Sequence, residues 1–141
     1  MAKLRPFLAA ALVGILAGLV GAAFHALLDQ ADQGRDLLRT ALEAAPVPGW
    51  LVLMALGALV LCVALWLVRR FAPETAGSGI QEVEAILAGE HGLGWQRVLP
   101  VKFVAGVLAV GSGLVLGREG PTVHMGAALG QLATERLGLD A

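Results

Sequence analysis

The stretch GREGP, residues 117–121, places two charged side chains inside a long uncharged part of the chain. No Asp, Glu, Lys or Arg occurs from residue 103 to 117 or from residue 120 to 134. The proline of this stretch is favoured in the first turn of a helix, where its missing N–H leaves no hydrogen bond unmade. GREGP therefore predicts a helix that begins at membrane depth, with Arg118 and Glu119 at its N-terminus.

The composition indicates a membrane protein. The chain has 141 residues, of which 57% are hydrophobic and 15% charged, and its mean hydropathy is +0.78. Soluble domains are nearer 45–50% apolar and about 25% charged. The net charge of -1 gives no basic field, so no nucleic-acid partner is expected.

The apolar runs predict that residues 1–141 form a single transmembrane region. The predicted fold class is an all-α, polytopic membrane protein with broken and short helices. A bilayer span needs about 20 apolar residues. The first run is also longer than the roughly 7–15 apolar residues of a secretory signal peptide. The expected spans are residues 6–28, 50–70, 98–116 and 121–137, with a short non-spanning helix at about 79–89.

Charges at the ends of the first two runs predict the topology. Lys3 and Arg5 precede the first run, and Arg69 and Arg70 follow the second. Basic residues favour the cytoplasmic side, so we expect a cytoplasmic N-terminus. The segment 29–43, which contains both acidic and basic residues, would then lie on the outer side of the membrane. It could extend the first helix, which the two prolines that follow would end.

Ser78, in the stretch AGSGIQ, precedes a short segment with helical periodicity. Serine is a favoured N-cap, and Gln81 three positions later would complete a capping box. A hydroxyl that caps a helix through its oxygen still has a hydrogen to donate. Two interpretations therefore stay open: Ser78 only caps the helix, or it caps the helix and also contacts an anion at the helix N-terminus.

Glu119 suggests a gating mechanism. A helix N-terminus favours negative charge, so the Glu119 carboxylate and a diffusing anion would compete for the same place. Protonation would remove the attraction of Glu119 for the N–H groups and let the side chain swing away. Proton and anion occupancy would then be linked reciprocally. Arg118 would attract anions to the mouth of the site.

The motifs GSGI, RVLPVKF and GREGPTV together resemble those of the CLC family of chloride channels and chloride/proton antiporters, in its bacterial form. The resemblance implies proton-coupled chloride exchange, or a chloride channel, with Glu119 as the protonatable gate. It also implies a homodimer in a bacterial inner membrane, with chloride, protons and the lipid bilayer as partners. The anion-binding residues that it implies are Ser78, Gly79, Ile80, Arg118, Glu119 and Gly120.

The chain departs from the family pattern in two ways. Gln81 stands where the first motif of the family usually has proline. The resemblance also covers only most of the first of two inverted repeats, and the chain contains no tyrosine for the chloride-coordinating position of the family. The alternative is therefore a truncated, non-transporting membrane fragment that associates with partner helices through GxxxG faces at Gly14/Gly18 and Gly126/Gly130.

Other residues give weaker signals. His25, His91 and His124 lack the spacing of metal ligands, so no metal site and no cofactor are expected. No phosphate-loop motif or catalytic dyad is present, so an enzyme is not expected. Lys102 could extend to the membrane interface or attract anions from the cytoplasm, and the sequence does not decide between these.

Overall fold

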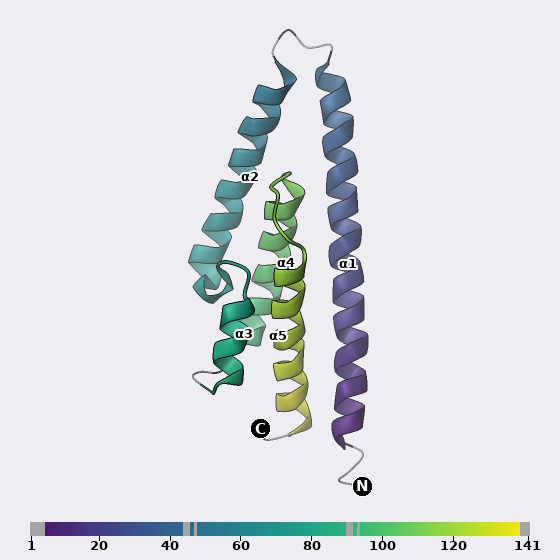
Figure 1. The fold of residues 1–141 in the computed structure, drawn as a ribbon, viewed down its shortest axis with the longest axis vertical. Coiled ribbons are helices and arrows are strands. Elements are labelled where there is room, and N and C mark those ends of the chain that lie inside the picture. Colours follow the sequence, from purple (N-terminus) through teal and green to yellow (C-terminus); the bar gives the residue numbers. More distant parts are fainter. Residues whose placement is uncertain (1–4, 44–45, 47, 90–91, 93, 139–141) are drawn as a thin grey trace.

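The computed structural model describes residues 5–43, 46, 48–89, 92 and 94–138, and within these residues it contains helices and no strand. This confirms the all-α fold class (Figure 1). The helices are α1 (Arg5–Leu42), α2 (Gly49–Phe71), the 3-10 helix η2 (Pro73–Thr75), α3 (Ile80–Leu87), α4 (Trp95–Gly111) and α5 (Glu119–Leu137).

The first two helices form a long hairpin that opens away from its connection, and α4 and α5 lie between its arms (Figure 1). Helix α1 continues without interruption through the polar segment 29–43 as far as Leu42, as the sequence predicted. Among the described residues, α1 and α2 are the helices long and apolar enough to cross a membrane.

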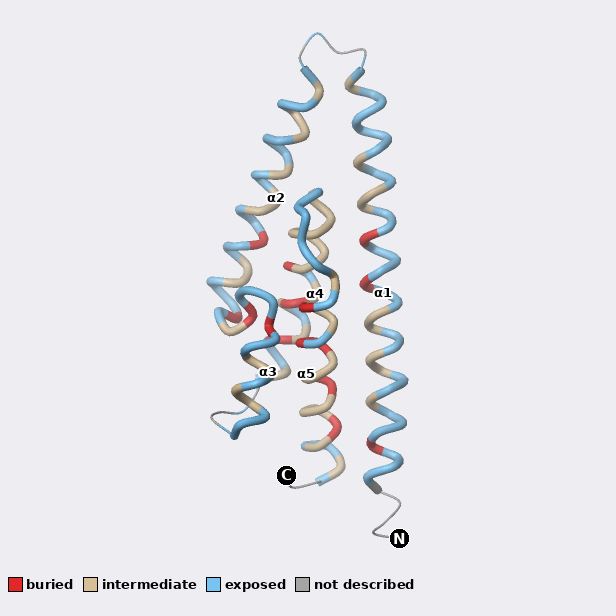
Figure 2. The backbone as a smooth tube through the Cα atoms, viewed as in Figure 1, coloured by how far each residue is buried: buried red, intermediate tan, exposed pale blue. Residues whose placement is uncertain are grey.

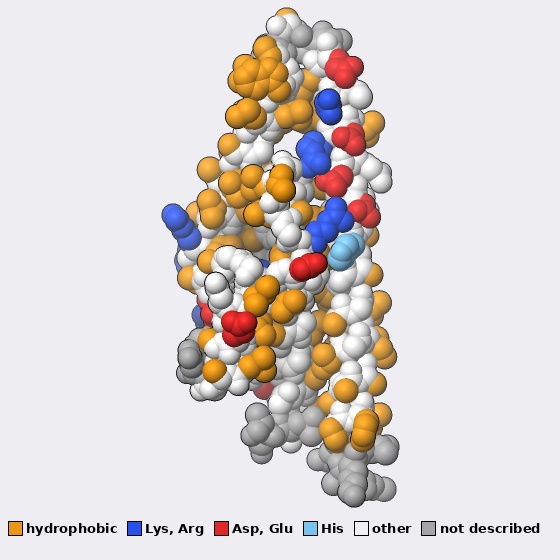
Figure 3. Space-filling view, in the orientation of Figure 1, with side chains coloured by type: hydrophobic (Ala, Val, Ile, Leu, Met, Phe, Trp, Pro, Cys, Tyr) orange, Lys and Arg blue, Asp and Glu red, His pale blue; other side chains and the backbone are white. Residues whose placement is uncertain are grey.

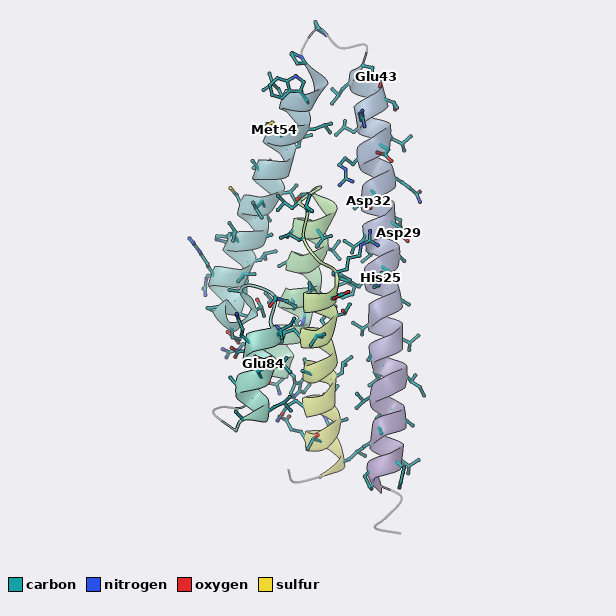
Figure 4. The ribbon with its side chains drawn as sticks, in the orientation of Figure 1. His25, Asp29, Asp32, Glu43, Met54 and Glu84 are labelled. Carbon is teal, nitrogen blue, oxygen red and sulfur yellow. The ribbon has the colours of Figure 1, made fainter. Side chains whose placement is uncertain are left out.

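Charge is distributed unevenly along α1. The visible face of its first half is hydrophobic, while acidic and basic side chains follow one another along its second half (Figure 3). The charged side chains of the second half belong to Asp29, Asp32, Arg35, Asp36 and Arg39, and Glu43 follows directly after the helix. This polar half lies beside the loop that leads into α5 (Figures 1 and 4).

Most of the buried residues lie where α1, α4 and α5 meet, a few lie on α2 and just after it, and the outer faces of the hairpin are largely exposed (Figure 2). Phe24 and Leu28 of α1 form a buried cluster with Met125 of α5. The Phe24 and Phe103 rings meet edge to face, with centroids 5.8 Å apart. In a bilayer such a cluster acts through close packing contacts and not through removal of apolar surface from water, and this packing holds α5 against α1.

The third apolar run does not form one helix over residues 98–116. Helix α4 begins earlier, at Trp95, and ends at Gly111. Gly113 has φ +95°, a left-handed conformation that ends a helix and that glycine adopts without steric cost. Residues 114–117 are irregular, and they carry the chain to the start of α5.

Candidate functional site

Helices α3 and α5 begin next to each other, and glycine makes this approach possible. Gly120 is buried, and a Cβ atom added to it would lie 2.8 Å from the Ser78 carbonyl oxygen and 3.1 Å from the Ser78 Cα. Real Cβ atoms do not approach backbone atoms so closely. The N-terminus of α5 therefore packs directly on the backbone that leads into α3.

A second glycine contact locks the same junction. Gly79 is buried with φ +84°, and a Cβ atom added to it would overlap the ring of His124 on α5. The His124 side chain is fully buried. Gly79 is thus required twice, once for its backbone conformation and once for the space that the imidazole fills. The contact fixes the direction in which α3 leaves the loop.

The predicted capping box at α3 is wrong in register. The N-cap residue is Gly79, not Ser78, and the helix begins at Ile80. The Ser78 hydroxyl oxygen nevertheless accepts a hydrogen bond of 3.3 Å from the Ile80 N–H. The left-handed Gly79 moves Ser78 back from the helix end, so its oxygen reaches the first helical N–H instead of the third. Its hydroxyl hydrogen is not used by that bond.

The start of α5 follows the sequence prediction. Helix α5 begins at Glu119, with Arg118 as its N-cap residue. The Thr122 hydroxyl donates to the Glu119 carbonyl oxygen at 2.7 Å and to the Arg118 carbonyl oxygen at 3.2 Å. GREGP thus produces a helix start with an acidic residue in its first turn, where the helix dipole favours negative charge.

An open cavity of about 540 Å³ lies in front of the two helix starts. Its walls come from α2, the segment from Thr75 to Ile80, α4 and the segment from Leu116 to Pro121. The cavity brings together four of the six predicted anion-binding residues: Ser78, Ile80, Glu119 and Gly120. Gly79 lies buried beneath the cavity wall against His124.

Arg118 is directed elsewhere. Its guanidinium lies 3.5 Å from the Asp32 carboxylate and 3.7 Å from the Asp29 carboxylate, both on α1. Asp29 and Asp32 are labelled in Figure 4 on the polar half of α1. Arg118 does not line the cavity. Its charge is therefore balanced by the two carboxylates of α1, and it attracts anions at the cavity less strongly than a free guanidinium would.

Lys102 is the cation that the cavity does contain. Its side chain is buried, with 4% exposure, and its ammonium donates to the carbonyl oxygens of Thr75 at 2.9 Å and Gly77 at 2.7 Å. This excludes the interpretation in which Lys102 extends to the membrane interface. In the sequence, Lys102 could be recognised as a lysine within an apolar run, because an ionisable residue at membrane depth usually has a partner or a function.

These features together describe a place suited to an anion. The N-terminus of a helix has unpaired N–H groups and a positive dipole end. Two such ends converge here, and Lys102 lies in the cavity wall. Glu119 is one of the residues that line the same cavity, it is exposed, and among the described residues its side chain has no ion pair.

Comparisons with known proteins identify the family. The sequence model described as "Voltage gated chloride channel" matches residues 60–140, more than half of the chain. The chain is 47% identical over 125 residues to the H(+)/Cl(-) exchange transporter ClcA of Vibrio cholerae, which covers 88% of this chain and 26% of the relative. It is 45% identical over 130 residues to the ClcA transporter of Citrobacter koseri, covering 91% of this chain and 27% of the relative.

A solved structure agrees with the sequence relatives. The crystal structure of a slow cyanobacterial Cl-/H+ antiporter superposes on this chain with a TM-score of 0.91 and 39% sequence identity. The superposition covers 96% of this chain and 32% of the antiporter, so the chain spans about a quarter to a third of the length of these proteins. This membrane protein therefore belongs to the CLC family of voltage gated chloride channels.

Proposed function

We propose that the chain forms the part of a proton-coupled chloride exchanger that holds its external gate. The observation that carries this proposal is the contact between Ser78 and Gly120, which puts two helix N-termini and Glu119 at one cavity. The relatives named as H(+)/Cl(-) exchange transporters support the same substrates. From the family resemblance of the motifs we also propose a homodimer in a bacterial inner membrane, and from the basic residues that flank the first two helices we propose a cytoplasmic N-terminus.

In this mechanism chloride binds in front of the starts of α3 and α5. The Ser78 hydroxyl hydrogen is available for the anion, because the hydroxyl oxygen is engaged with the Ile80 N–H. The backbone N–H groups at the start of α5 and the ammonium of Lys102 add positive potential. No covalent chemistry is needed, since binding and release of the anion change only hydrogen bonds and charge contacts.

Glu119 would act as the gate because it is an anion on the same helix start. When ionised, its carboxylate competes with chloride for the N–H groups of α5. When protonated, it loses that attraction and yields the place to chloride. Each proton taken up by Glu119 is thereby linked to a change in chloride occupancy, which is the coupling that exchange requires.

The test uses a completed chain, in which residues 1–141 are followed by the remaining part of the Vibrio cholerae relative. Glu119→Gln is close to the protonated glutamate in size and cannot ionise. We expect chloride efflux from proteoliposomes to persist, its pH dependence to flatten, and a chloride gradient to stop driving proton uptake. Full proton coupling in Glu119→Gln would refute Glu119 as the gate.

A second candidate function is association with partner helices, without transport by this segment alone. Cβ atoms added to Gly14 and Gly18 on α1, or to Gly126 and Gly130 on α5, would meet no atom within 4 Å, so both GxxxG faces are open. Small residues allow close helix contacts in lipid. Chloride flux from liposomes that contain residues 1–141 alone would contradict this second candidate.

A further inference from the structure

We propose that Asp32 is a positioning residue for Glu119, because it ties both ends of the loop between α4 and α5 to α1. The inference rests on the proposed role of Glu119 as the gate. It starts from the position of one carboxylate between two arginines, Arg35 on its own helix and Arg118 at the end of the loop.

The far end of the loop is held through Arg118. One oxygen of the Asp32 carboxylate, Oδ2, lies 3.5 Å from Arg118 Nη2. Asp29 adds a second carboxylate, with its Oδ1 atom 3.7 Å from Arg118 Nη1. Two acidic side chains one helical turn apart on α1 thus face the two terminal nitrogens of one guanidinium. Two contacts, at 3.5 and 3.7 Å, restrain the direction of the arginine more than a single contact of this length would.

The near end of the loop is held through Arg35. The other oxygen of Asp32, Oδ1, lies 3.1 Å from Arg35 Nη2, and Arg35 Nη1 donates to the Gly111 carbonyl oxygen at 3.5 Å. A Cβ atom added to Gly113 would lie 2.9 Å from Arg35 Nη1. Glycine at position 113 therefore makes room for the guanidinium beside the turn that ends α4.

The residues between these two ends have few contacts of their own. Leu114, Val115 and Leu116 are exposed apolar side chains, and Val115 is fully exposed. Within this segment the structure gives one backbone hydrogen bond, from the Leu116 N–H to the Leu114 carbonyl oxygen, at 2.8 Å. The position of the loop therefore depends mainly on its ends, and both ends lead to Asp32.

Fixing Arg118 also orients Glu119. The two residues are adjacent, yet Arg118 points to α1 while Glu119 lines the cavity bounded by α2, α3 and α4. A guanidinium tied to α1 limits rotation of the first turn of α5, and through this turn it restrains where the adjacent Glu119 lies at the cavity.

The expected effect is moderate, because these side chains are partly exposed. Exposed ion pairs contribute little individually, and their loss corresponds to about a two- to fivefold change in an equilibrium constant. We therefore expect Asp32→Asn to lower proton uptake per chloride released by about two- to fivefold. Chloride efflux itself should change less, since Ser78, Lys102 and the helix starts are unaltered.

The experiment measures chloride efflux and proton uptake together in proteoliposomes of the completed chain. Asp36→Asn is the matched control, because Asp36 lies on the same helix, is exposed and has no contact with the loop among the described residues. Asp32→Glu keeps the carboxylate and should restore most of the coupling. In an Arg118→Gln background, Asp32→Asn should lower coupling less than it does alone, because the tie to the far end of the loop is already absent and only the Arg35 contact remains to be lost.

A structural measurement accompanies the transport assay. Hydrogen exchange of the peptide that covers residues 112–120 should be faster in Asp32→Asn than in Asp36→Asn. The inference is overturned if Asp32→Asn and Asp36→Asn show the same coupling ratio while Glu119→Gln abolishes coupling. If Glu119→Gln retains full coupling, the proposed gate itself is wrong, and the two failures are thereby distinguished.

Discussion

Gly120 packs on the backbone of Ser78 so closely that one added methyl group would lie 2.8 Å from the Ser78 carbonyl oxygen. The two residues are far apart in the sequence: Ser78 leads into α3, and Gly120 lies in the first turn of α5. Their contact is therefore what joins GSGI to GREGP in space. It places the start of α3 and the start of α5 at one cavity, with Glu119 beside them.

Gly120→Ala should separate the two helix starts. The added methyl group meets backbone atoms, which cannot rotate away, and overpacking of this kind costs about 1–3 kcal/mol. We expect chloride binding, measured by isothermal titration calorimetry on the completed chain, to weaken by about fivefold or more. Gly126→Ala is the control, because its Cβ atom meets nothing within 4 Å. Equal affinities for the two variants would contradict the importance of the contact.

Gly79→Ala should destabilise the protein more than Gly77→Ala. Both glycines have positive φ, +84° and +71°, so both substitutions carry the left-handed strain of about 1–2 kcal/mol. At position 79 the methyl group would also overlap the His124 ring, whereas at position 77 it meets nothing within 4 Å. Thermal unfolding in detergent measures the difference, and a midpoint for Gly77→Ala as low as that for Gly79→Ala would contradict a destabilising overlap with His124.

Ser78→Ala should weaken chloride binding while leaving the fold intact. Loss of one hydrogen bond to an anion costs about 0.5–3 kcal/mol, towards the upper end because the acceptor is charged. Ser112→Ala is a suitable control, since its hydroxyl donates to the Ala109 carbonyl oxygen and it lies outside the cavity. Unchanged chloride affinity in Ser78→Ala would mean that the serine serves only to bond the Ile80 N–H.

Lys102→Met should reduce chloride affinity and loosen the segment before α3. The methionine keeps the apolar stem but removes the charge and the donors to the Thr75 and Gly77 carbonyl oxygens. Hydrogen bonds from charged donors contribute about 1.5–3 kcal/mol each, so a measurable loss of stability should accompany the loss of affinity. Arg97→Gln, an exposed change on the same helix, should alter neither. If Lys102→Met binds chloride normally, the lysine is structural alone.

The predicted topology is tested with single cysteines in a Cys62→Ser background. Gln33→Cys lies on the polar half of α1 and Glu84→Cys on α3, and both positions are exposed. With a cytoplasmic N-terminus, an impermeant thiol reagent added to intact cells should label position 33 and spare position 84. Labelling of position 84 alone would reverse the orientation.

The local chemistry of the sequence predicted the elements well. Pro121 beside Glu119 predicts a helix start, and the helix begins there, because the fixed φ of proline and the acidic first turn act within a few residues. The polar segment 29–43 was expected to extend the first helix, and it does as far as Leu42. The capping box was misplaced, since a left-handed Gly79 shifts the helix start by a residue and is not visible as such in the sequence.

The sequence by itself determined the membrane composition, the helical class and the two motifs that begin α3 and α5, because these follow from hydrophobicity and from neighbours along the chain. Only the tertiary structure decided what each charged group meets. Arg118 contacts Asp32 across 86 positions, and Lys102 reaches carbonyl oxygens 25 and 27 positions away. Such partners depend on how the helices pack, and here that packing follows from the glycines at positions 79, 113 and 120, which let neighbouring groups approach where any side chain would collide.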